Sequence, residues 1–68
     1  MSPAPYVGQV VHYRTRGAPS RIVPALIVAL HGEGDRADLT VFLLGRIEYA
    51  PAALQGRTPG CWTEIPDD

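Results

Sequence analysis

The stretch ALIVALHGEGDRADLTVFLLG, residues 25–45, decides the fold of this 68-residue chain. It holds two short apolar runs, 25–31 and 37–45, on either side of a polar segment with two glycines. Apolar runs of this length, bounded by glycine and proline, are typical of buried strands, although alanine and leucine also favour helices. A short glycine-rich link suits a tight turn. The stretch therefore predicts a β-hairpin.

Strand signals continue on both sides of this hairpin. Valine and tyrosine are frequent in residues 7–15, and residues 61–65 form a last short run of strand formers. Apolar and charged side chains alternate over residues 46–49, which predicts a half-exposed strand. The segment PAALQG then combines a proline suited to a first helical position with a glycine suited to a cap. We therefore expect one short helical turn near residues 51–55.

The spacing of these elements predicts the fold class. About five short strands separated by turns indicate an all-β protein. Parallel pairing would need crossover helices for which the chain has no room, so the pairing should be antiparallel. We expect a small antiparallel SH3-like barrel, with an OB-fold second because it normally needs a longer chain. Prolines make residues 1–6 an extended N-terminal arm, and residues 7–66 form the single barrel domain.

The charge balance bears on the partners of this protein. The net charge is −1 and every basic residue is an arginine, so the chain has no general attraction to nucleic acid or acidic lipid. The start of the chain lacks the basic and apolar regions of a signal peptide. No apolar stretch approaches the roughly 20 residues that span a bilayer. We expect a protein that is not secreted and has no membrane partner.

A catalytic or metal-binding constellation is hard to assemble from these residues. His12 and His31 are the only histidines, and they fall on different expected strands. Cys61 is the only cysteine, so it can form no intrachain disulfide. It also has no adjoining basic residue to favour a reactive thiolate. We predict no enzymatic activity, no cofactor and no metal site.

Both alternating sets of side chains in the strand 25–31 are apolar. One set is Leu26, Val28 and Leu30, and the other is Ala25, Ile27 and Ala29. A barrel strand turns only one set inward, so the other set needs a cover, which is either a protein partner or the arm together with PAALQG. The predicted protein interface comprises Leu26, Val28, Leu30, Phe42, Leu44 and Trp62.

A second candidate surface gathers arginine and tyrosine around the first loop. Arginine interleaved with aromatic residues is a common arrangement for nucleic-acid binding, because it combines phosphate contact with base stacking. The negative net charge argues against this role, and arginines also occur in solvated loops. The predicted contacts of a nucleic acid or another ligand are Tyr13, Arg14, Arg16 and Arg21.

Three motifs, VGQVVHY, ALIVALH and PGCWTEIP, suggest an origin for the chain. They resemble motifs of small, largely uncharacterised proteins encoded by actinobacteria and their bacteriophages. Those proteins carry Val-Gly-x-x-Val-His-Tyr, then an Ala-Ile-Val strand, then Pro-Gly-Thr-Trp-His. Cys61 and Thr63 depart from the pattern, since threonine and histidine are usual there. The matching positions are Gly8, Val11, His12, Tyr13, Ile27, Val28, Pro59, Gly60 and Trp62.

The resemblance implies a bacteriophage or actinobacterial source and no catalytic residue. Together with the uncovered apolar set, it leads us to expect a phage-encoded structural or accessory protein that binds an assembled particle. Its partner would be a capsid or tail subunit, copies of itself, or both, in the virion or the host cytoplasm. The alternative is a small regulatory or anti-defence module that binds nucleic acid, a nucleotide or a host protein.

Overall fold

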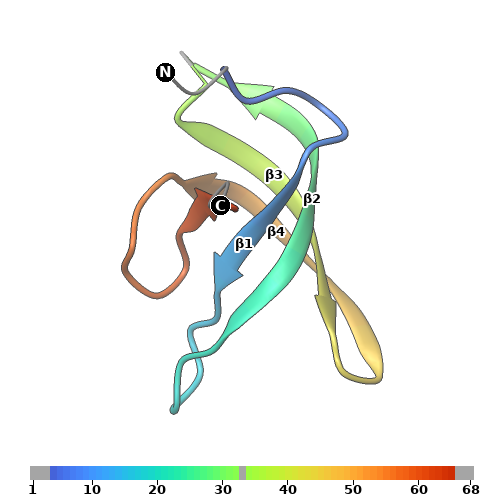
Figure 1. Ribbon diagram of the computed structural model, residues 1–68, viewed down its shortest axis with the longest axis vertical. Helices are drawn as coiled ribbons and strands as arrows, with labels where there is room; N and C mark the ends of the chain where they lie inside the picture. The colour runs from blue at the N-terminus through green and yellow to red at the C-terminus, as the bar shows by residue number, and fades with distance from the viewer. Residues whose placement is uncertain (1–3, 33, 66–68) are drawn as a thin grey trace.

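The computed structural model describes residues 4–32 and 34–65 of the chain. They form one antiparallel sheet with the strand order β4-β3-β2-β1-β5 and contain no helix, which confirms the expected all-β class. Figure 1 shows the sheet strongly curled, with the link between β4 and β5 arching away at one side. The strands are β1 (Val10–Arg14), β2 (Ile22–His31), β3 (Arg36–Leu43), β4 (Arg46–Leu54) and β5 (Trp62–Glu64).

The strand order matches that of the expected SH3-like barrel, but the ladder of strand pairing is not closed. β1 to β4 form a meander, and β5 returns to pair with β1. Just after β4, Gln55 forms an isolated bridge with Trp62 of β5, and no ladder joins β4 to β5 in the described residues. The Trp62 indole N–H adds a hydrogen bond of 3.0 Å to the carbonyl oxygen of Ala53. Trp62 therefore joins the two sides of an open barrel.

The core lies on the inner face of the curled sheet. Ala25 and Ile27 of β2 face inward, so the structure selects this apolar set for the core. Burying one such side chain contributes about 1.5–3 kcal/mol when it is large, but very little when it is alanine. The core is therefore small for a chain of this length. Its buried members are Val11, Ala25, Ile27, Ala37, Leu39, Val41, Ala53 and Trp62.

A bulge in β2 breaks the simple alternation of its side chains. Ile27 pairs with Leu39 whereas Ala29 pairs with Asp38, so Val28 is an extra residue in the strand. An inserted residue shifts the phase of every side chain that follows it. The prediction that Leu30 shares a face with Val28 is therefore wrong, because Leu30 packs against the core.

The expected helical turn near residues 51–55 is also wrong. This segment is the second half of β4, and it contains a bulge of its own. Ala37 pairs with Ala53 and Leu39 with Ala50, so Pro51 and Ala52 together lie opposite one residue of β3. β4 is an edge strand, where a proline can be accommodated because one side of the strand needs no partner. Tertiary pairing with β3 therefore overrides the local preference for a helix.

Two strand boundaries differ from those expected. β1 begins at Val10 rather than residue 7, because a turn at Gly8, with φ of 97°, precedes it. β2 begins at Ile22 rather than residue 25, and Pro24 lies within it. The ladder to β3 ends at Ala25, so Pro24 pairs only with β1.

Within the described residues no helix is long and apolar enough to cross a membrane. The first half of the expected arm, residues 1–3, and the last barrel residue, 66, lie outside the described residues.

Candidate functional site

The outer face of the sheet carries a row of exposed apolar side chains. We call this surface, formed by Val10, Ile22, Leu26, Val28, Phe42 and Ile47, the outer apolar face. Its most exposed members are Ile47 at 66%, Ile22 at 53% and Val10 at 50%. Leu26 is half-buried beneath its neighbours, while Val28 and Phe42 remain exposed.

Strand register places these apolar side chains on one face of four strands, with Thr40 opposite Leu26 and Arg14 opposite Ile22. Val10 of β1 pairs with Leu26 of β2, and Phe42 of β3 pairs with Ile47 of β4. Paired residues in an antiparallel sheet point to the same side, with Cβ atoms about 5 Å apart. Large apolar side chains that gather in the open on one face of a small protein are typical of interaction sites. The outer apolar face therefore resembles a surface that contacts another macromolecule.

The structure sorts the predicted interface residues into three groups. Leu26, Val28 and Phe42 lie on the outer apolar face, and Leu44 is fully exposed at the tip of the β3–β4 hairpin. Trp62 is completely buried, so its assignment to the interface is wrong; it packs in the core and bridges β5 to β4. Leu30 is turned inward by the bulge. The predicted interface did not include Val10, Ile22 and Ile47. Only the strand register shows that these residues lie on the same face as the outward side chains of the β2–β3 hairpin.

The alternative cover for this face is not found among residues 4–32 and 34–65. PAALQG belongs to the edge of the sheet as part of β4 and its continuation. In the described part of the arm, residues 4–6, the Tyr6 side chain is itself 58% exposed. The outer apolar face therefore stays open to solvent over the part of the chain that the structure describes.

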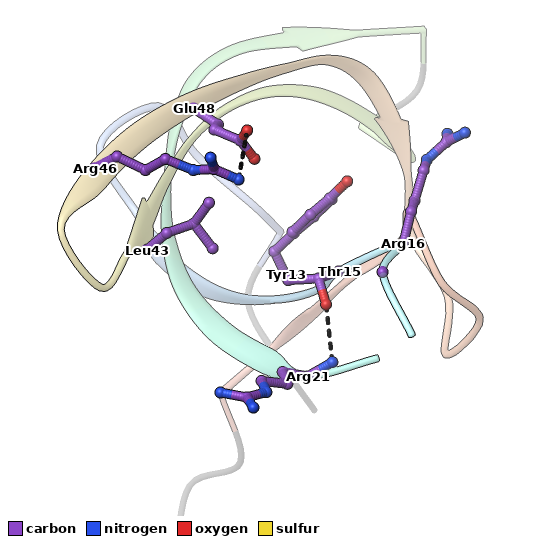
Figure 2. Close-up of a pocket in the computed structure, with 8 residues that line it drawn as sticks. Tyr13, Thr15, Arg16, Arg21, Leu43, Arg46 and Glu48 are labelled. Atoms are coloured by element: carbon purple, nitrogen blue, oxygen red, sulfur yellow. Dashed lines mark hydrogen bonds and ion pairs between the residues drawn. The ribbon is translucent and has the colours of Figure 1, made fainter. Parts of the chain in front are cut away.

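An open cleft lies on the inner side of the sheet, between the loop after β1 and the β3–β4 hairpin. Its volume is about 390 Å³, and its base is formed by Tyr13 and Leu43, which also pack against the core. Figure 2 shows Tyr13 between Arg16 on one side and Arg46 with Glu48 on the other. An adjoining hollow of about 320 Å³ shares Tyr13 and Arg16 and continues along β4. Together these two hollows form what we call the trough.

Only three of the four residues predicted to contact a nucleic acid or ligand line the cleft. Tyr13, Arg16 and Arg21 do so, although Figure 2 shows the Arg21 guanidinium pointing away from Tyr13. Arg14 does not, because alternation along β1 turns it to the same side as Ile22, its partner in β2. Arg46 was missed by sequence reasoning, since it reaches the cleft only through the pairing of β4 with β3.

The guanidinium groups around the cleft differ in their partners. Arg46 Nη2 lies 3.2 Å from Glu48 Oε2, and both side chains are exposed, so this ion pair contributes little to stability. Arg16 and Arg21 form no ion pair with any residue that the structure describes. The cleft therefore offers free positive charge on a chain whose net charge is negative.

The loop that carries these arginines is held by hydrogen bonds between its ends. The Thr15 backbone N–H donates to the Arg21 carbonyl oxygen at 2.8 Å, and the Arg21 N–H donates to Thr15 Oγ1 at 2.8 Å. The Ser20 hydroxyl donates to the Thr15 carbonyl oxygen at 2.6 Å. These bonds close the loop and set the positions from which the two arginine side chains extend.

A polar cluster at the far end of β3 centres on Asp38. Its Oδ1 accepts a hydrogen bond of 2.8 Å from the Ala52 N–H and lies 3.1 Å from His31 Nε2. The Ala52 hydrogen bond, followed by the His31 contact, lowers the pKa of Asp38. The hydrogen bond between Tyr49 and this carboxylate raises the pKa of the Tyr49 phenol. The cluster fastens the bulge of β4 to β3 and is structural.

Neither the cysteine nor the histidines assemble with other groups into a reactive site. Cys61 Sγ lies 3.2 Å from Thr58 Oγ1, and within the described residues no group of histidine, cysteine and carboxylate side chains could hold a metal ion. No family model, curated protein or solved structure matches the chain. The outer apolar face and the cleft are therefore the two candidate sites, and both are argued from geometry.

Proposed function

We propose that this chain is a non-enzymatic structural or accessory protein that docks on an assembled bacteriophage particle. Within this proposal it decorates the capsid or forms a minor capsid or tail-associated component. Its partner is a capsid or tail subunit, with copies of the chain as neighbours on the same particle. The observation that carries the proposal is the outer apolar face, and the choice of a phage particle is supported by the motif resemblance.

The energetics of the outer apolar face favour a protein partner. At roughly 25 cal/mol per Å², covering a few hundred Å² of apolar surface contributes several kcal/mol. That amount is comparable to the whole free energy of unfolding of a domain of this size, about 3–5 kcal/mol. Val10, Ile22 and Ile47 project beyond the sheet, so they can enter depressions on a partner. The charged ends of the sheet would form the polar rim that such interfaces usually have.

The test is incorporation into purified particles. Quantitative mass spectrometry of virions should find the chain at a fixed ratio to the capsid or tail subunits. A chain with both Val10→Thr and Ile47→Thr should lose at least tenfold in binding, because each change puts a hydroxyl where the interface is apolar. Threonine keeps the β-branched shape that strands favour, so the fold should be retained.

Val7→Thr is the matched control for this experiment. It makes the same chemical change at an equally exposed valine, but in the turn before β1 rather than on the outer apolar face. It should leave incorporation unchanged. Absence of the wild-type chain from particles would contradict the proposal, and so would equal incorporation of the double variant.

A further inference from the structure

The trough on the inner face of the sheet is a second binding site, separate from the outer apolar face. We propose that it binds an acidic, extended peptide segment of a partner protein. One row of apolar side chains in that segment covers the base of the trough, and its carboxylates pair with Arg16 and Arg21. This inference does not depend on the particle-docking role, because it concerns the opposite face of the sheet.

The shape of the trough suits an extended segment. The cleft and the adjoining hollow share Tyr13 and Arg16, so the surface continues from the loop after β1 towards Pro51 and Ala53. Its base is largely apolar, with the Tyr13 ring and Leu43 at one end and the alanine and proline side chains of β4 at the other. Alternate side chains of an extended peptide point the same way, so one row can cover this base.

The charge of the trough selects an acidic partner. Arg16 and Arg21 make no ion pair within the described residues, whereas Arg46 is occupied by Glu48. A guanidinium binds a carboxylate through two parallel hydrogen bonds, which gives both strength and orientation. Figure 2 shows the Tyr13 hydroxyl pointing towards the side of the cleft where Arg16 lies, whereas the Arg21 side chain extends away from it. The hydroxyl forms no hydrogen bond within residues 4–32 and 34–65, so it can donate to a carboxylate that Arg16 binds.

The Arg16 side chain lies in space that Gly60 leaves open. A methyl group on Gly60 would lie 2.5 Å from Arg16 Nε and 3.0 Å from its Cζ. Gly60 therefore leaves the room in which the guanidinium rests. The Gly60 N–H also donates to the Arg14 carbonyl oxygen at 2.7 Å, which fixes this loop against the end of β1. Arg16 is exposed to solvent, and its guanidinium lies beside Gly60 at the wall of the trough.

A carboxylate-bearing peptide fits better than a nucleic acid. The net charge of −1 repels a polyanion at long range, and Glu48 lies in the cleft itself. Nucleic-acid binding also draws on several phosphate contacts at once, and Arg14 is turned to the other face. The carboxylates of a short peptide need only the local charges of Arg16 and Arg21.

The experiment is an NMR titration of the whole chain, labelled with ¹⁵N. The probe is a blocked hexapeptide of alternating leucine and aspartate, and its control has asparagine in place of aspartate. We expect amide shifts at residues 13–17 and 46–50 with the acidic peptide, and at least tenfold weaker binding of the amide peptide. Arg16→Gln should weaken binding about tenfold and Arg16→Lys less, because lysine keeps the charge but loses the paired hydrogen bonds.

Arg57→Gln is the matched control, since it removes the same charge from an exposed position outside the trough. It should leave the affinity within about twofold. The proposal is overturned if the acidic peptide gives no shifts in the trough at millimolar concentration, or if both peptides bind equally. It is also overturned if hexathymidylate binds there and the peptide does not. None of these results bears on particle incorporation, which depends on the outer apolar face.

Discussion

At the scale of single residues, Asp38 shows how one side chain can hold an irregular strand in place. Its carboxylate accepts the hydrogen bond of the Ala52 N–H, which the bulge of β4 removes from the regular ladder. An unpaired N–H at this point would cost about 1–3 kcal/mol if it were shielded from water. His31 approaches the same carboxylate from the end of β2. Asp38 therefore links three strands through local contacts.

The Asp38 carboxylate should make the free energy of unfolding vary with pH in the acidic range. The Ala52 hydrogen bond and the His31 contact lower its pKa in the folded protein below the ordinary value of 3.8. A carboxyl group whose pKa is lower in the folded than in the unfolded protein stabilises the fold at pH values above its unfolded pKa, about 4. This stabilisation is lost as the pH falls through the folded pKa. Asp38→Asn should therefore be less stable than the wild type at pH 7, and the difference should shrink below pH 4. Urea unfolding from pH 7 to 2 measures this, and parallel curves for the two proteins would contradict it.

At the scale of elements, the two bulges decide which side chains reach each face. Val28 shifts the phase of β2, and Pro51 with Ala52 shifts the phase of β4. Each insertion increases the local twist of its strand, which helps a five-stranded sheet to curl. The curl separates the two surfaces of the molecule, with the trough inside and the outer apolar face outside.

The bulge of β4 contains a residue under backbone strain. Ala52 has φ of 49°, a left-handed conformation that costs a non-glycine residue about 1–2 kcal/mol. Glycine adopts this conformation freely, although it also gains entropy in the unfolded chain. Ala52→Gly should therefore raise the free energy of unfolding by up to about 1 kcal/mol, measured by urea denaturation. Ala53→Gly, at the buried neighbour with no such strain, should instead destabilise the protein, and a loss of stability in both variants would contradict the interpretation.

At the scale of the whole molecule, large apolar side chains divide between a small core and the outer apolar face. Among residues 4–32 and 34–65, three of the eight buried core residues are alanines, and the largest buried side chain is that of Trp62. A 68-residue domain buries only about 60% of its unfolded surface, so we expect a free energy of unfolding of about 3–5 kcal/mol. Exposed apolar residues add almost nothing to that value while they remain in water.

This division predicts that stability and partner binding respond to different substitutions. The double variant with Val10→Thr and Ile47→Thr should unfold within about 1 kcal/mol of the wild type, because both residues are at least half exposed. Trp62→Phe should cost about 2–4 kcal/mol, since it opens a cavity and leaves the Ala53 carbonyl without its indole donor. Urea denaturation of purified chains measures both. An outer-face variant that costs as much as Trp62→Phe would show that the face belongs to the fold.

The sequence by itself determined the class of structure and the presence of an uncovered apolar set. Short apolar runs between glycines and prolines favoured strands over helices, and the absence of room for crossovers favoured an antiparallel sheet. The apolar character of both faces of β2 was visible because it depends on alternation over a few residues. The gathering of Tyr13, Arg16 and Arg21 around one loop was also visible, because these residues are close in the chain.

Only the tertiary structure decided which apolar set forms the core, where Leu30 and Trp62 lie, and that residues 51–54 form a strand. Bulges arise from pairing between strands, and a one-residue shift leaves no mark in local sequence patterns. Because local patterns do not show strand register, the sequence analysis did not place Ile22 and Ile47 on the outer surface or Arg46 at the cleft. These residues acquire their neighbours through strand register, which depends on the energy of the whole sheet and on contacts between segments far apart in the chain.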